Sequence, residues 1–473
     1  MRHWQPLGAT TPRGPVKVAL AILLNVAFLA VLLPWLWQQW RWAGPTWWRL
    51  ALVLGLGLRL GVGLVRNWTL KIDAAFMSSL ARIVTDQMWT DPAAAVQTFT
   101  QAVVVMPIKS ETGVPLYDAV FQSTANTWVL VKILALLNLG SLGFGWINGF
   151  YLSVFAFAGC WQLVRCLRQV LPGIPAGAGV VAFLLWPTVW FWATGISKEA
   201  VLLGSGAWLT ARVLTSLYAA PEGEQRRWWR QMRWWLATVG LALVHFYMRY
   251  FFAIPLLGAL GAVALAHHLA RLGWAPYRFA QAAVIALVLA VGVWVVPQLS
   301  VAFSVNKFTY QVIRVYSHEL TQSAGKPHFE YPNLRPTIES IAAHAPLAAV
   351  NSLTRPWLGE SRQPLYIAVG LENAGIAVLF VLALAAVWCG RSGHLPFGLG
   401  VGLVLLCLVL AVLMGLTTPN YGSLSRYRSG LLPFVVFLLL QNDYAAGLLQ
   451  RLGLREVAQS PKNSNERLAG PVA

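Results

Sequence analysis

The sequence WPTVWFWATGISKEA, residues 186–200, interrupts an apolar run over residues 177–218 that is long enough for two bilayer crossings. Lys198 and Glu199 are the only Lys and the only acid in that run. Ionisable groups near hydrocarbon are costly, which favours a functional Lys198–Glu199 pair under the preceding aromatic residues. A structural alternative remains open: Ser197 caps the next helix, Glu199 lies in its first turn, and Lys198 extends toward the headgroups.

The composition around this stretch predicts an all-α, polytopic membrane protein. Of 473 residues, 58% are hydrophobic and 11% are charged, and the mean hydropathy is +0.61. The 24 Trp and 13 Tyr are typical of interfacial belts in contact with membrane lipids. The net charge of +19 is spread over many short loops, so it indicates orientation and headgroup contact, and it argues against nucleic acid as a partner.

The apolar runs predict about 11–12 membrane spans in a single domain over residues 1–450. A polar tail, 451–473, is expected to be disordered and cytoplasmic. The first run is too long for a signal-peptide core and should remain as an anchor. One apolar segment, 127–143, is ambiguous because Lys132 lies within it. The expected spans are 17–38, 47–65, 146–167, 177–195, 200–218, 234–247, 250–268, 279–299, 366–388, 397–416 and 429–447.

Lys and Arg are unevenly distributed between the later loops, which predicts the orientation. Residues 219–233 and 267–278 are basic and are expected on the cytoplasmic side. Residues 196–199, 300–365 and 417–428 then lie on the opposite side. The run 234–268 would be roughly 52 Å long as one helix, so it should fold back near Arg249.

Two long polar segments are expected to form the extracytoplasmic part. Residues 66–125 are cytoplasmic if 127–143 crosses the membrane and extracytoplasmic if it is re-entrant, and the second arrangement is favoured. Within this segment, Asp91-Pro92 predicts a helix start, with an interfacial helix over 93–106 that Pro107 ends. Residues 300–365 are predicted to form a cap, with helices at 305–322 and 336–351.

The acids are concentrated on the predicted extracytoplasmic side. Either a site lies there, or acids are simply tolerated on the translocated side. Eleven of the sixteen acids belong to this group: Asp73, Asp86, Asp91, Glu111, Asp118, Glu199, Glu319, Glu330, Glu339, Glu360 and Glu372.

Basic residues on the same side are candidate ligands for phosphate. His245 and Arg249 share one helix face at the expected fold-back, and the planar guanidinium is suited to phosphate groups. Arg426 and Arg428 lie in a short outer loop, against the positive-inside tendency. Glu372 lies in an apolar span and needs a partner. The alternative is that these arginines extend into an aromatic belt.

No motif defines a metal or nucleotide site. The sequence contains no Walker loop, dinucleotide fingerprint, H-E-x-x-H or G-x-S-x-G. The three histidines of the long loop lack metal-ligand spacing. The four cysteines lie in apolar runs without C-x-x-C spacing, which argues against a disulfide framework or a zinc site.

Four patterns together resemble bacterial polysaccharide-biosynthesis membrane proteins, which are similar to GT-C-type glycosyltransferases. The resemblance extends over about residues 66–440 and is one of pattern and spacing. It rests on the Phe-Trp-x-x-Gly-x-x-Lys-Glu pattern within Pro187 to Ala200, on Thr354-Arg355-Pro356-Trp357, on Leu371-Glu372-Asn373, and on Ser425-Arg426-Tyr427-Arg428 followed by Pro433.

The resemblance implies transfer or polymerisation of sugars from a polyprenyl-(di)phosphate-linked donor to a saccharide acceptor, outside the bacterial inner membrane. An acid in the first outer loop would act as base or metal partner, a role that falls to Asp73, with Asp86 as second choice. A divalent cation is compatible with this chemistry. The sequence departs from the pattern in its additional apolar hairpin before that loop and in lacking a paired Asp-x-Asp motif. Arg249, Arg355 and Arg426 are expected to bind the donor phosphate.

A protein of another class would need the same basic contacts. A carrier or flippase for lipid-linked saccharides must bind the same phosphate, but it needs no catalytic base. Sensitivity to the loss of one carboxylate separates the two hypotheses.

Overall fold

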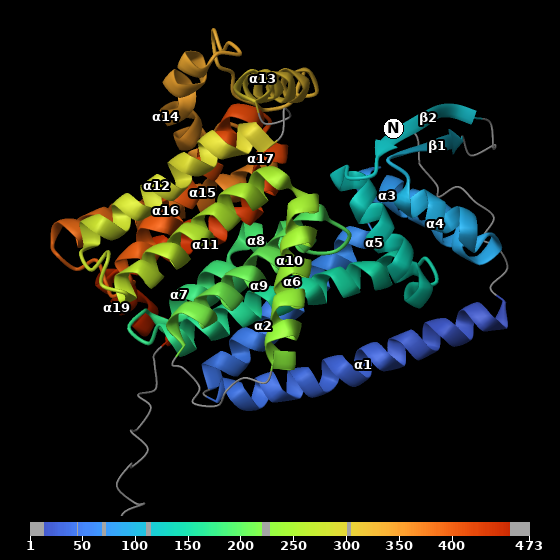
Figure 1. Ribbon diagram of the computed structural model, residues 1–473, viewed down its shortest axis with the longest axis horizontal. Coiled ribbons are helices and arrows are strands. Elements are labelled where there is room, and N and C mark those ends of the chain that lie inside the picture. The colour runs from blue at the N-terminus through green and yellow to red at the C-terminus, as the bar shows by residue number, and fades with distance from the viewer. Residues whose placement is uncertain are drawn as a thin grey trace, which may run out of the picture.

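A computed structural model of the chain describes residues 14–44, 46–68, 72–109, 115–219, 228–299 and 304–454. These residues form a helical bundle with one β-hairpin (Figure 1). Eight of the described helices are long and apolar enough to cross a membrane, in agreement with a multi-pass protein. They are α1 (Pro15–Ala43), α2 (Thr46–Trp68), α6 (Gly145–Val170), α9 (Lys198–Tyr218), α11 (Tyr250–Arg271), α12 (Arg278–Leu299), α15 (Pro364–Trp388) and α16 (Phe397–Thr417).

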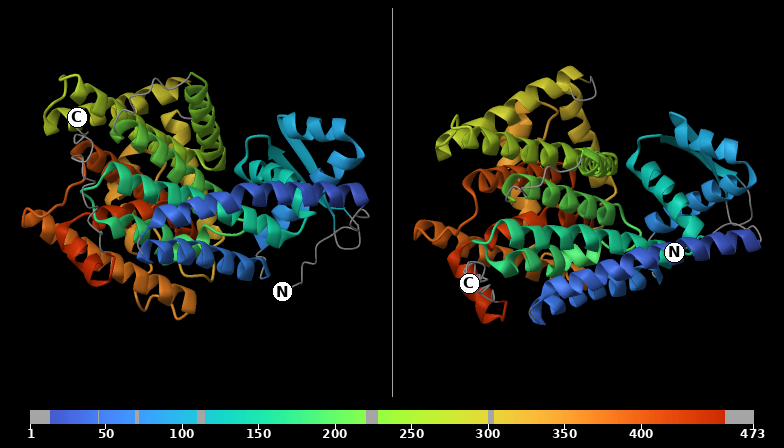
Figure 2. Two further views of the ribbon diagram at one scale, coloured as in Figure 1. Left: turned by 90° about the horizontal axis from the view of Figure 1, so that it is seen from below. Right: turned by 60° about the horizontal axis from the view of Figure 1, so that its bottom comes forward.

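Helices α6 and α9 form the centre of the bundle. They approach closely because glycine faces glycine: a Cβ on Gly159 would lie 2.1 Å from the carbonyl oxygen of Gly204. Helix α10 (Trp228–Met248) packs beside α9, and its chain folds back into α11 at Arg249, whose backbone is extended. The predicted fold-back is therefore present. Helices α1 and α12 lie at the periphery and leave most of their apolar residues exposed (Figure 2).

The predicted span 177–195 is wrong as a continuous helix. It consists of α7 (Ala176–Val180), a π-helical turn (Val181–Leu185) and α8 (Pro187–Trp192). Pro187 has no N–H to donate and forces Trp186 out of the helical region. The freed carbonyls are satisfied by Arg59 of α2, which is fully buried and donates to Phe183 O at 2.8 Å and to Ala193 O at 3.2 Å.

The predicted span 429–447 is also broken. Helix α18 (Leu432–Leu439) and helix α19 (Asp443–Arg451) meet at 96°. Asn442 caps α19 by accepting a hydrogen bond from Ala445 N at 2.9 Å. Phe183 packs edge-on against Phe434, with ring centroids 5.3 Å apart, so the two broken segments contact each other inside the bundle.

The first long polar segment lies beside the bundle (Figure 1). It contains α3 (Ile72–Thr90), α4 (Pro92–Thr100), the antiparallel strands β1 (Val103–Lys109) and β2 (Pro115–Gln122), and α5 (Asn126–Ser141). Asp91 caps α4 as predicted, accepting from Ala94 N at 3.0 Å. The helix predicted over 93–106 is nevertheless wrong beyond Thr100. The run of β-branched valines that follows favours a strand, and Pro107 is tolerated in a hairpin in which each strand is an edge.

Both ends of helix α5 lie on the same face of the bundle. At its start, Asn126 Oδ1 accepts a hydrogen bond from Lys198 Nζ at 2.9 Å. After its end, Gly145 packs against Ile196, since a Cβ there would lie 3.7 Å from Ile196 Cδ1. Both ends are therefore beside the start of α9, and the segment from α3 to α5 lies on the same face as that start.

The second long segment caps the same face. It contains α13 (Val305–Thr321) and α14 (Ile338–Thr354), close to the predicted 305–322 and 336–351. It is tied to the end of α16 and the turn that follows: Tyr331 donates its hydroxyl to Gly415 O at 3.1 Å, and Phe329 N donates to Pro419 O at 3.2 Å. The short helix α17 (Tyr421–Tyr427) follows that turn.

Thiol labelling tests the sidedness of this face. In a background without the four natural cysteines, we expect Asp86→Cys, Glu330→Cys and Ser423→Cys to react with an impermeant reagent in cells whose outer membrane is permeable. These positions lie on the face at which α9 begins, and the loop between α11 and α12, which carries Arg271 and Arg278, lies on the other. His394→Cys, on the opposite face, serves as the control and should react only after lysis. Protection of residue 86 alone would contradict the placement of α3.

Candidate functional site

Glu199 lies at the centre of the charged residues on this face. It is the second residue of α9, whose cap is Ser197, with Ala200 N donating to Ser197 Oγ at 3.1 Å, as in the structural alternative considered for this stretch. Its side chain is only 1% exposed. Glu199 Oε1 is 2.9 Å from Nη2 of Arg249 and 3.0 Å from Nε of Arg426. One buried carboxylate is therefore shared by two guanidinium groups from distant parts of the chain.

Lys198 has different partners, so the predicted Lys198–Glu199 pair is wrong. Its Nζ donates to Asn126 Oδ1 at 2.9 Å and to Thr127 Oγ1 at 2.7 Å, both at the start of α5. Consecutive residues of a helix point about 100° apart, because there are 3.6 residues per turn. The two side chains therefore diverge, and each makes a separate contact on the same face.

Asp73 forms the solvent-exposed end of a series of ion pairs that leads to Glu199 and Arg249. It lies in the first turn of α3, and its side chain is 72% exposed. Arg426 Nη1 donates to Asp73 Oδ2 at 3.1 Å, while the other edge of the same guanidinium faces Glu199. The network runs from solvent to the buried interior in the order Asp73, Arg426, Glu199, Arg249. Arg426 is thus shared between an exposed carboxylate and a buried one.

Arg66 is a member of this site that sequence reasoning missed. Its Nη1 donates to the carbonyls of Phe191 (2.8 Å), Trp192 (3.1 Å) and Thr194 (3.2 Å), and it is close enough to interact electrostatically with Glu199 and Arg426. The signal available in the sequence was an Arg that ends an apolar span. We name the whole set the Glu199 cluster: Arg66, Asp73, Lys198, Glu199, Arg249 and Arg426.

Aromatic rings fix two of the arginines. The guanidinium of Arg249 lies 3.9 Å from the ring centroid of Tyr427, and that of Arg66 lies 5.4 Å from the ring centroid of Trp192.

Burial lowers the pKa of Arg426, but Glu199, Tyr427 and Asp73 outweigh it and raise that pKa overall. The guanidinium of Arg426 therefore carries its charge throughout the physiological range.

The charges of the Glu199 cluster do not balance. The cations are Arg66, Lys198, Arg249 and Arg426, and the anions are Asp73 and Glu199, so four positive charges face two negative ones and an excess of two remains. A partly buried excess of positive charge attracts an anion. Guanidinium groups favour phosphate in particular, because their fork of donors matches its oxygens.

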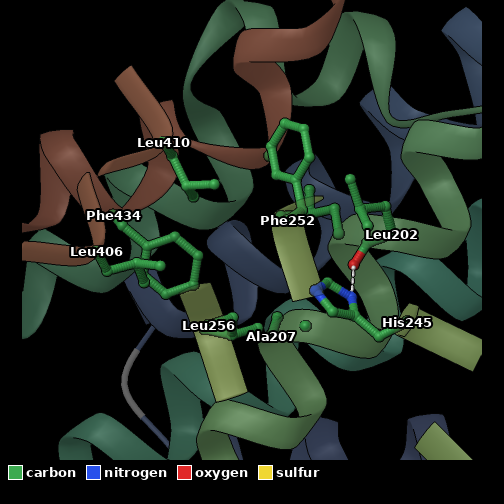
Figure 3. Close-up of a pocket in the computed structure, with 11 residues that line it drawn as sticks. Leu202, Ala207, His245, Phe252, Leu256, Leu406, Leu410 and Phe434 are labelled. Carbon is green, nitrogen blue, oxygen red and sulfur yellow. Dashed lines mark hydrogen bonds between the residues drawn. The ribbon is translucent and has the colours of Figure 1, made fainter. Parts of the chain in front are cut away.

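His245 is a structural residue in this arrangement. It is buried, with Nδ1 3.0 Å from Ser205 Oγ and 3.1 Å from Leu202 O, while Nε2 has no hydrogen-bond partner. Figure 3 shows its ring beside a small cavity whose other walls are apolar, including Phe252 and Phe434. The structure therefore places His245 between helices and not in the Glu199 cluster, where the sequence predicted it.

Four further predicted residues also lie outside the cluster: Arg355, Glu372, Arg428 and Asp86. Arg355 is bonded to Glu360 and to the hydroxyl of Tyr421 at 3.1 Å. Glu372 accepts hydrogen bonds from the backbone and hydroxyl of Thr188.

Arg428 is fully buried, and burial lowers its pKa to about 10 while Glu372 opposes that shift. Its Nη1 donates to Asn373 Oδ1 at 3.0 Å and to three backbone carbonyls, so it holds the chain around residues 352–355 in place.

Asp86 is far from the cluster for a geometric reason: thirteen residues along α3 separate it from Asp73, which is about 20 Å of helix.

No metal centre is formed by the described residues, among which no three His, Cys, Asp or Glu side chains gather in a suitable geometry. The cap histidines have other partners: His328 Nε2 is 3.0 Å from Glu330, and His344 contacts backbone carbonyls.

The comparisons with known proteins identify no relative. No protein-family model, no curated protein and no solved structure matches the chain. Of the predicted site residues, the structure brings together Asp73, Lys198, Glu199, Arg249 and Arg426, and it adds Arg66 to them.

Proposed function

We propose that this protein is a glycosyltransferase or polysaccharide polymerase of the bacterial inner membrane that uses a polyprenyl-(di)phosphate-linked sugar as donor. The observation that carries the proposal is the excess of positive charge in the Glu199 cluster, with an exposed carboxylate at its edge. Arg66, Arg249 and Arg426 bind the donor phosphate. The polyprenyl chain lies in the surrounding membrane, and the sugar extends toward the cap formed by α13 and α14.

In this proposal, Asp73 is the general base. An acceptor hydroxyl oxygen attacks the anomeric carbon of the donor, and the bond between that carbon and the phosphate oxygen breaks. Asp73 takes the hydroxyl proton, and the leaving phosphate keeps the electron pair of the broken bond. The guanidinium groups stabilise the charge that develops on the leaving oxygen. Glu199 positions those groups and does not touch the reacting atoms.

Asp73 and the donor phosphate compete for Arg426, so donor binding precedes proton transfer to Asp73. In the structure Arg426 Nη1 donates to Asp73 Oδ2 at 3.1 Å. A donor phosphate offers this guanidinium a stronger, bidentate partner than an exposed carboxylate does. Donor binding therefore releases Asp73 to accept the proton only when the leaving group is in place.

A carrier of lipid-linked saccharides is the second candidate, and one observation favours it. The broken segments α7–α8 and α18–α19 pack against each other inside the bundle, and discontinuous helices are common at the substrate sites of transporters. The glycosyltransferase is preferred because Asp73 is exposed at the edge of the cluster, where its carboxylate is accessible to an acceptor hydroxyl.

Conservative arginine variants test phosphate binding. We expect Arg66→Lys, Arg249→Lys and Arg426→Lys each to lower the use of a lipid-linked donor by about tenfold or more, because a point charge cannot replace a bidentate contact. The measurement is the release of free polyprenyl (di)phosphate by the purified protein. Arg355→Lys is the matched control: this residue pairs with Glu360 outside the cluster and should stay close to the parent. Normal turnover in all three cluster variants would contradict the proposal.

A further inference from the structure

A second concentration of arginine lies at the other end of the bundle, where α1 turns into α2 and α6 approaches its end. Three guanidinium groups there stack on tryptophan rings contributed by α1 and α2. We name this set the Trp–Arg cluster: Trp40, Trp42, Trp48, Arg49, Arg165 and Arg168.

The two α6 arginines are held close together despite their like charge. Arg165 and Arg168 are one helical turn apart, and both guanidinium carbons lie 5.1 Å from the ring centroid of Trp42. Arg168 also lies 4.6 Å from the centroid of Trp48. Helices α1, α2 and α6 contain no Asp or Glu. The elements that build this cluster therefore supply positive charge only.

Rigid packing beneath the rings maintains this arrangement. Trp48 and Trp161 are buried, and their ring centroids are 6.2 Å apart. Gln39 Oε1 accepts hydrogen bonds from Trp161 Nε1 at 3.0 Å and from Arg165 Nη1 at 3.2 Å. The Nε atoms of Arg49 and Arg165 are buried without a hydrogen-bond partner. The walls of the site are thus already ordered.

The position of the Trp–Arg cluster along the bundle matches the lipid headgroup layer of the leaflet opposite the Glu199 cluster. Gly145, at the start of α6, lies beside Ile196 near the Glu199 cluster, and twenty residues separate it from Arg165, which is roughly 30 Å of helix. That length is about the hydrocarbon thickness of a bilayer. Cys166 contacts Thr215 near the end of α9, so the Trp–Arg cluster shares its face with the end of α9. Trp and Arg at this depth are typical of a membrane–water boundary.

We infer that the Trp–Arg cluster is a binding site for the phosphate headgroup of an anionic phospholipid, in the leaflet opposite the Glu199 cluster. The phosphodiester oxygens accept from Arg49, Arg165 and Arg168, and the acyl chains follow the exposed apolar surfaces of α1 and α2. This site is independent of the donor site proposed above and serves a different ligand.

Lipid binding to the purified full-length protein tests this inference. In native mass spectrometry from neutral detergent, the parent should retain phosphatidylglycerol in preference to phosphatidylcholine. The double variant Arg165→Gln/Arg168→Gln should bind phosphatidylglycerol about thirtyfold more weakly, and Arg168→Gln alone about fivefold. The single variant provides the test if the double variant does not fold.

Arg278→Gln is the matched control, because its guanidinium also stacks on one ring, that of Phe397 at 5.9 Å, but without a second arginine on that ring. This variant should bind like the parent. Unchanged phosphatidylglycerol binding in the α6 variants would overturn the inference. Two results together would overturn the lipid assignment in favour of free phosphate. Millimolar inorganic phosphate would displace the bound lipid, and phosphate alone would raise the melting temperature as much as the lipid does.

Discussion

Glu199→Gln is expected to destabilise the folded protein by about 3–5 kcal/mol and to remove donor turnover. The substitution keeps the shape of the side chain but leaves Arg249 and Arg426, whose side chains are 6% and 23% exposed, without their common counter-charge. Removing one partner of a buried ion pair has an effect of that size. The two guanidinium groups then repel each other, so a bound phosphate is no longer aligned for transfer. Thermal unfolding and polyprenyl (di)phosphate release measure the two effects.

Two comparisons separate this role from that of a simple helix cap. Lys198→Met removes hydrogen bonds to Asn126 and Thr127 and should be milder, at about 1–3 kcal/mol. Added polyprenyl phosphate should raise the melting temperature of Glu199→Gln more than that of the parent, since the ligand supplies the missing anion. A loss of only about 0.3–1 kcal/mol, with normal turnover, would reduce Glu199 to a residue that complements the helix dipole.

Asp73→Asn is expected to cause the largest loss of turnover that is not accompanied by a large loss of stability. Loss of the general base should lower turnover by about 10²–10⁴-fold. Stability should change by no more than about 1 kcal/mol, because the side chain is 72% exposed and its ion pair with Arg426 is close to solvent. Turnover of the lipid-linked donor and the melting temperature are measured on the same preparation.

Asp86→Asn is the control for Asp73→Asn. It changes an acid of the same helix that lies about 20 Å farther along α3, and it should behave like the parent. If Asp73→Asn turns over donor normally, Asp73 is not the base. If that variant also moves lipid-linked saccharide between leaflets as the parent does, the carrier becomes the better assignment.

Eight of the eleven spans expected from the apolar pattern are long apolar helices among the described residues, because crossing a membrane requires about 20 apolar residues and leaves a strong signal. The expected total of about 11–12 spans is therefore higher than the described part of the structure supports. The apolar pattern also predicts the fold-back at Arg249, which follows from length alone. The breaks in α7–α8 and α18–α19 were not predicted. Pro187 marks the first, but its consequence depends on Arg59, which satisfies the freed carbonyls from a different helix.

The partners within the Glu199 cluster could not be predicted from the sequence. Asp73 and Arg426 are 353 positions apart, and Glu199 and Arg249 are 50 apart, so no local spacing relates them. Adjacency in sequence suggested the Lys198–Glu199 pair, but helix geometry separates those two side chains. Chemical type was the better guide for four members: Lys198 and Glu199 are ionisable residues in an apolar run, and Arg249 and Arg426 are arginines expected on the same membrane face. Asp73 was identified only through the resemblance to GT-C-type proteins, and Arg66 was missed at the end of an apolar helix.

A structure of the protein with a bound polyprenyl-diphosphate sugar tests the central claim most directly. We predict phosphate density in contact with the guanidinium groups of Arg66, Arg249 and Arg426, with the Asp73 carboxylate released from Arg426 and facing the anomeric carbon. Phosphate density elsewhere, with the Asp73–Arg426 and Arg249–Glu199 contacts unchanged, would contradict the assignment of the Glu199 cluster as the donor site.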